Sequence, residues 1–195
     1  MTALPGPQPA QPGRPDPGVE LLERALAYTR GALITVTPGH LHLPTPCDAW
    51  SLADLLAHME DGLDAFGEGA GGTIGLRPAS TAPLPDLIES LQVKACGLLG
   101  DWAASQTSVV DVGGHPVAVE TITRLAALEI SIHGWDVART TGHDAAVPDE
   151  LAEALLPTAL AVALEQTDEF DPPVPVSADA AASRRLLALL GRRAR

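Results

Sequence analysis

Aromatic side chains are scarce in this 195-residue sequence, where they make up 3% of residues although 46% are hydrophobic. A core must therefore be built from aliphatic side chains and alanine, which favours packed helices over a β-sandwich. The length fits one domain that can bury such a core without disulfide staples.

Basic residues are also few, with 12 Lys and Arg against 25 Asp and Glu and a net charge of −13. Nucleic-acid binding depends on basic residues clustered on a folded face, so we expect no nucleic-acid partner. One basic cluster lies close to the end of the sequence, and we interpret it as a solvated tail without function. It consists of Arg184, Arg185, Arg192, Arg193 and Arg195.

Long apolar runs are absent, and no basic region followed by an apolar run opens the sequence. We therefore expect neither a membrane span nor a signal peptide, and we predict a cytoplasmic protein. Cys47 and Cys96 are far apart and match no CxxC spacing, so we expect no disulfide.

Six prolines lie within residues 1–17, which predicts a disordered tail before a single domain over 18–195. Helical spacing of apolar residues then predicts four main helices. Ser51 and Asp54 form a capping box for the second of them. The predicted ranges are Gly18 to before Pro38, 52 to about 67, 84–103 and about 117–141.

Two connectors carry their own signals. GEGAGGTIG (67–75) follows a helix and lacks the GK[ST] ending of a phosphate loop, so we predict a flexible connector. VVDVGGHPVAV (109–119) predicts a small hairpin or tight loop before the long helix. A helix over about 149–166, an extended segment at 170–176 and a short helical end at 184–191 complete an all-α, up-down bundle.

Glu129 and His133 lie in the middle of the apolar face of the long predicted helix. They are one turn apart, so their side chains stand side by side on the face that points into the bundle. An unpaired carboxylate there would cost several kcal/mol, so Glu129 must be neutralised, paired or bound to a metal.

His58 lies at the flank of the apolar face of the second helix and could face the same space. His58, Glu129 and His133 would then give two imidazoles and one carboxylate, the ligand set of open catalytic zinc sites. Equally, Glu129 and His133 could simply form an ion pair beside a cavity. The same ligand set also suits ferrous iron, and nickel stays open.

Three further residues are candidates for the surroundings of this site. Asp136 could orient a ligand histidine or accept hydrogen bonds at the helix end. Trp50 and Trp135 could wall a pocket or pack in the core. The remaining histidines are expected to be exposed, and they are His40, His42, His115 and His143.

Two motifs contain these residues, PTPCDAWSLADLLAH (44–58) and EISIHGWDVARTTGH (129–143). They resemble the metal-binding domain of mycothiol-dependent maleylpyruvate isomerase, within the DinB-like superfamily. FDPPVPV and RRLLALLG near the end of the sequence are also similar to actinobacterial members of that group. The resemblance covers about residues 19–191 and implies a DinB-like four-helix bundle with zinc held by His58, Glu129 and His133.

The resemblance also implies the chemistry of a low-molecular-weight thiol, because a divalent metal with an open position stabilises a thiolate at neutral pH. We therefore expect a mycothiol-dependent transferase or isomerase acting on a small electrophile. The isomerase has a further C-terminal domain that contributes an arginine to catalysis, so we do not expect maleylpyruvate isomerase activity itself. A metal-dependent hydrolase, a non-catalytic metal-binding bundle and a homodimer stay open.

Overall fold

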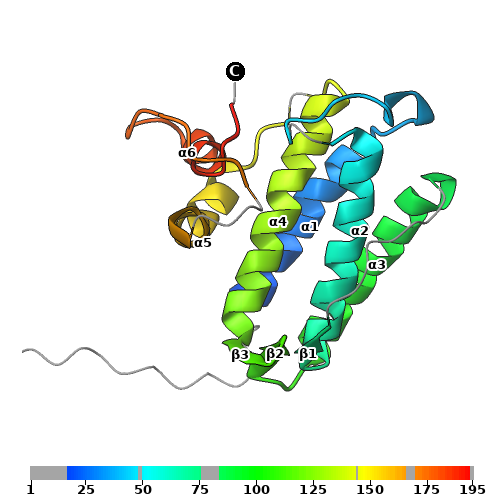
Figure 1. Ribbon diagram of the computed structural model, residues 1–195, viewed down its shortest axis with the longest axis vertical. Coiled ribbons are helices and arrows are strands. Elements are labelled where there is room, and N and C mark those ends of the chain that lie inside the picture. Colours follow the sequence, from blue (N-terminus) through cyan, green and yellow to red (C-terminus); the bar gives the residue numbers. More distant parts are fainter. Residues whose placement is uncertain (1–16, 48–49, 76–83, 144, 166–169, 194–195) are drawn as a thin grey trace, which may run out of the picture.

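Six α-helices and a three-stranded sheet form the described part of the computed structural model (Figure 1). The described residues are 17–47, 50–75, 84–143, 145–165 and 170–193. The helices are α1 (Pro17–Leu33), α2 (Leu52–Ala70), α3 (Leu84–Ala104), α4 (Val119–Thr140), α5 (Asp149–Glu165) and α6 (Ala182–Leu189), with a 3-10 turn at Pro38–His40. The strands are β1 (Thr73–Ile74), β2 (Val109–Val112) and β3 (His115–Ala118).

The helix ends follow the capping signals in the sequence. The Asp54 N–H donates to the Ser51 hydroxyl, and the Ser51 N–H donates to the Asp54 carboxylate, so the predicted capping box begins α2. Gly142 has a φ of +75°, which a helix-ending glycine adopts without strain, and it follows α4 as predicted. The predicted tail lies outside the described residues except for Pro17, which begins α1.

The sheet corrects two expectations. Residues 109–119 form the hairpin β2–β3, whose turn is made by Gly113 and Gly114 with φ of +59° and +87°. The segment 67–75, predicted as a flexible connector, instead completes α2 and supplies β1. Because β1 pairs with β2, the fold is mainly helical but not all-α.

The directions of the helices correct the up-down prediction. β1 and β2 are parallel, so α2 and α3, which lead into them, both end at the sheet (Figure 1). Three side-chain hydrogen bonds join α2 to α3, and the residue numbers of both partners increase from one bond to the next, which confirms this parallel direction. They are Ser90 to Glu60, Lys94 to Asp64, and Ser105, just after α3, to Ala70.

Helix α4 packs mainly against α1, and these two helices are also parallel. The Thr29 hydroxyl donates to the Ile130 carbonyl at 2.7 Å, and Thr35 contacts Thr141 at 2.8 Å. A Cβ at Gly134 would lie 2.3 Å from the Thr29 hydroxyl oxygen, so only glycine permits this close approach.

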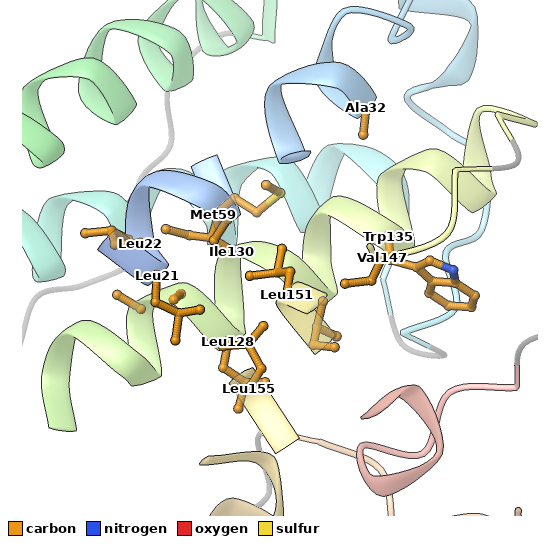
Figure 2. Close-up of a cluster of buried hydrophobic side chains, with 14 of the residues drawn as sticks. Leu21, Leu22, Ala32, Met59, Leu128, Ile130, Trp135, Val147, Leu151 and Leu155 are labelled. Carbon is orange, nitrogen blue, oxygen red and sulfur yellow. The ribbon is translucent and has the colours of Figure 1, made fainter. Parts of the chain in front are cut away.

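The core joins these helices to α5. Buried side chains of α1, α4 and α5 meet in it, including Leu22, Leu128, Leu151 and Leu155 (Figure 2). Helix α6 then packs on α5, so the C-terminal helices cover one side of α4. Among the described residues, no helix has the length and apolar character needed to cross a membrane.

Candidate metal centre

The structure brings together the three predicted ligands, His58 from α2 and Glu129 and His133 from α4. The His133 Nε2 atom lies 3.2 Å from Glu129 Oε2, and the His58 Nε2 atom lies 3.9 Å from the same oxygen. One ligand atom from each residue lies within 4.8 Å of the other two. The i,i+4 spacing within α4 and the antiparallel neighbour α2 therefore produce a cluster of three donor atoms.

This cluster fits a divalent ion. A tetrahedral zinc ion with ligands at about 2.0–2.2 Å holds its donor atoms roughly 3.3–3.6 Å apart. The distances from Glu129 to His133 and to His58, 3.2 Å and 3.9 Å, lie on either side of that range. The His133 side chain is 4% exposed, Glu129 is 18% exposed and His58 is 43% exposed. The cluster is therefore buried on the α4 side and open on the α2 side, which leaves access for a small molecule.

Asp136 sets the orientation of His133. Its Oδ2 atom lies 3.1 Å from His133 Nδ1, and its side chain has no exposed surface. Donation from Nδ1 to this carboxylate leaves Nε2 with the free lone pair that a metal requires. The structure therefore places Asp136 where it can hold a ligand histidine in the correct tautomer and rotation.

Arg192 also belongs to the surroundings of the cluster, which the sequence did not reveal, and its assignment to a solvated tail is wrong. It is 2% exposed, and its guanidinium donates to both oxygens of Asp136, from Nε at 3.3 Å and from Nη2 at 3.0 Å. Arg184, Arg185 and Arg193 are exposed as predicted, and Arg195 lies outside the described residues. One sequence signal could have indicated such a partner, because the Asp136 carboxylate on the buried face of α4 needs a cation.

The turn after α6 explains the burial of Arg192. Gly191 has a φ of +76°, and a Cβ there would lie 2.3 Å from the Asp171 Cβ. This glycine turns the chain back toward α4. Arg192 then lies over the Phe170 ring at 5.4 Å and reaches the Asp171 carboxylate at 3.7 Å.

Two aromatic rings border the cluster. The Trp50 ring lies 4.6 Å from the His58 ring and 6.2 Å from the His133 ring, measured between centroids. Phe170, which the sequence analysis did not single out, stacks on His133 at 6.2 Å. Trp135 does not wall the pocket, because it is a buried core residue on another side of α4, near Val147 (Figure 2).

The other histidines stay away from the cluster. His42, His115 and His143 are exposed as predicted. His40 is half-buried in the 3-10 turn, where its Nδ1 atom accepts a hydrogen bond from the Thr37 N–H. Cys47 lines the same cavity as His58, and burial raises the pKa of its thiol while the nearby Arg192 opposes that shift.

The charges of the cluster couple strongly. Burial alone would raise the pKa of Glu129, but the hydrogen bonds and charges of His133 and His58 outweigh burial and lower this pKa to about 2. Burial would lower the pKa of His133, but Asp136 and Glu129 raise it to about 9. Without a metal, His133 is therefore an imidazolium at neutral pH.

Comparison with known proteins identifies relatives of this chain. The family model described as "Mycothiol maleylpyruvate isomerase N-terminal domain" matches residues 22–138, more than half of the chain. Two curated proteins of Mycobacterium tuberculosis, from strains CDC 1551 / Oshkosh and ATCC 25618 / H37Rv, are similar to this chain, and both are called uncharacterized. Each is 29% identical over 145 residues, which cover 72% of this chain and 76% of the relative.

Proposed function

Because the chain belongs to the mycothiol maleylpyruvate isomerase N-terminal domain family, we propose that it is a metal-dependent enzyme that uses mycothiol or a similar thiol. The reaction class that fits best is transfer of the thiol to a small electrophile, or isomerisation of that electrophile. The clustering of His58, Glu129 and His133 carries this proposal. In the same proposal, α1 to α4 form a DinB-like four-helix bundle around this cluster.

In this proposal, three residues bind the metal ion and the residues around them orient or shield these ligands. His58 and His133 present Nε2 atoms and Glu129 presents an oxygen to the ion, with zinc as the best candidate and nickel or iron as the alternatives. A divalent ion held there supplies positive charge that favours a thiolate over a thiol at neutral pH. Asp136 and Arg192 keep His133 oriented, while Trp50 and Phe170 shield the cluster from bulk water.

The open side of the cluster supports an enzyme. Three protein ligands leave a position for a further molecule, as in catalytic rather than structural zinc sites. The exposed edge of His58 and the cavity beside it give a thiol and an electrophile access to that position. A hydrolase would use the same ligands without a thiol, and a non-catalytic protein would bind metal without turnover.

The first test is elemental analysis of tag-free protein together with His58→Ala, Glu129→Ala and the control His115→Ala. His115 is exposed in the hairpin that precedes α4, and it does not line the cavity that contains the cluster. We expect close to one metal ion per chain in the wild type and the control, and loss of that metal in the other two variants. Equal, negligible metal in all four proteins would overturn the proposal.

The second test separates the reaction classes. Metal-loaded protein is assayed with a panel of electrophiles in the presence and absence of mycothiol. Turnover that requires the thiol supports the proposal, and equal turnover without the thiol identifies a hydrolase. Metal binding with no turnover and no thiol binding would leave a non-catalytic metal protein.

A further inference from the structure

The metal cluster lies on the wall of a much larger cavity. This cavity has a volume of about 1500 Å³ and is lined by residues from all of α1, α2, α3 and α4. Ligand pockets commonly have volumes of about 300–1,000 Å³, so the space exceeds what one small electrophile needs. Its shape and chemistry therefore contain information about the substrate.

One arm of the cavity runs from the cluster toward the sheet. Along α2, the lining residues after His58 continue to Phe66, about two turns or roughly 12 Å away. Along α4, they run back from His133 to Ile122, about three turns or roughly 16 Å. Ile74 of β1 and Val112 of β2 also line the cavity, so the arm reaches the end of the helices at the sheet.

The inner wall of this arm is apolar. Leu63 and Phe66 on α2, Leu125 on α4 and Leu99 on α3 contribute aliphatic and aromatic surface. Thr29 also lines the cavity, but its hydroxyl already donates to the Ile130 carbonyl. A polar ligand there would therefore leave its hydroxyl and amide groups unpaired, which costs free energy.

The charged and amide side chains that line the cavity lie either on its solvent-exposed side or at the metal cluster. Glu23 and Arg30 of α1 and Gln92 of α3 line the cavity but are exposed. At the other end stand the two imidazoles and the carboxylate of the metal cluster. The cavity is thus amphipathic along its length, with reactive groups at one end and an apolar arm leading away from them.

We propose that this arm binds the hydrocarbon chain of an elongated electrophile whose reactive end lies at His58, Glu129 and His133. This inference rests on the proposed thiol transfer and assigns its substrate class. An α,β-unsaturated aldehyde with an alkyl chain has this form. The thiol sulfur bonds to the β-carbon, the electron pair of the C=C bond moves to the α-carbon, and the thiol proton ends there, so no oxidant or leaving group is needed.

Binding is tested first, without turnover, by calorimetry of metal-loaded protein with n-alkanols from butanol to decanol. Each methylene that enters an apolar site contributes about a fourfold gain in affinity. We expect that gain for each added carbon until the arm is filled. Affinity that does not change with chain length would overturn the proposal.

A matched pair of variants locates the chain. Leu125→Trp narrows the arm one turn from Glu129, while Leu160→Trp adds the same side chain to an exposed position of α5 outside the cavity. We expect Leu125→Trp to weaken decanol binding at least tenfold and butanol binding little, and Leu160→Trp to change neither. Ala95→Trp on α3, which also lines the cavity, gives a second variant if Leu125→Trp does not fold. Equal decanol affinity in the folded cavity variants and the control would overturn the proposal.

Kinetics separate this proposal from the proposed function. With mycothiol and unbranched 2-alkenals, kcat/KM should rise with chain length in the wild type and stop rising at shorter chains in Leu125→Trp. Thiol-dependent turnover that ignores chain length would overturn the substrate class and leave the proposed function standing. Chain-length-dependent alkanol binding without any thiol-dependent turnover would support the apolar occupant and overturn the proposed function.

Discussion

Removing the buried charge of Arg192 should destabilise the protein strongly. The side chains of Arg192 and Asp136 have no exposed surface, and their closest atoms are 3.0 Å apart. Removing one partner of a buried ion pair typically costs about 3–5 kcal/mol, because the other charge stays buried and uncompensated. Asp136 keeps one partner in protonated His133, so we expect the lower end, about 3 kcal/mol, for Arg192→Met.

Urea unfolding of metal-free protein at pH 7, followed by circular dichroism, measures this loss without stabilisation from bound metal. For a protein of this size the same loss lowers Tm by about 6–12 °C. The control is Arg193→Met, the exposed neighbour, which should change stability by less than about 0.5 kcal/mol. If both variants unfold at the same urea concentration, the buried ion pair does not have the role argued for it.

Three further results are expected. Asp136→Asn should weaken metal binding about 10–100-fold in a chelator competition. The control Asp101→Asn, at an exposed position of α3, should leave the metal affinity unchanged. Equal affinities in the two variants would contradict the orienting role of Asp136. Because the metal must displace the proton of His133, whose pKa is about 9 without metal, metal affinity should rise about tenfold per pH unit from pH 7 and level off above pH 9. Calorimetry across that range checks the slope, and a flat profile would show that His133 is neutral or not a ligand. Gly134→Ala should lower the free energy of unfolding by about 1–3 kcal/mol, because the added Cβ would collide with Thr29. The control Gly97→Ala, whose Cβ would meet nothing within 4 Å, should be neutral or slightly stabilising. Equal effects of the two substitutions in chemical denaturation would contradict a required close approach at Gly134.

Local signals made much of the fold and the cluster predictable. The capping box at Ser51, the hairpin at Gly113 and Gly114, and the apolar spacing of α4 are all properties of short segments. Glu129 and His133 share one helix, so their mutual placement follows from helix geometry alone. His58 then needed only a neighbouring helix that presents its flank.

Long-range contacts explain the errors. The parallel direction of α2 and α3 is linked to the pairing of β1 with β2, in which Thr73 lies opposite Asp111. These two short strands are far apart in the sequence, and no local pattern predicts that they pair. The burial of Arg192 depends on where α6 packs, and an arginine after an apolar run also fits an exposed end. A single sequence indicates such contacts only indirectly. Here the one indication is the buried charge of Asp136 on α4, which has no obvious partner in the sequence.

The parallel packing of α1 on α4 has a consequence for folding kinetics. Thr29 and Ile130, which join these helices, are 101 positions apart in the sequence. Helical proteins usually fold fast because their contacts are local, whereas closing a loop of this length carries an entropic cost before any contact forms. We therefore expect this chain to fold more slowly than bundles of consecutive antiparallel helices.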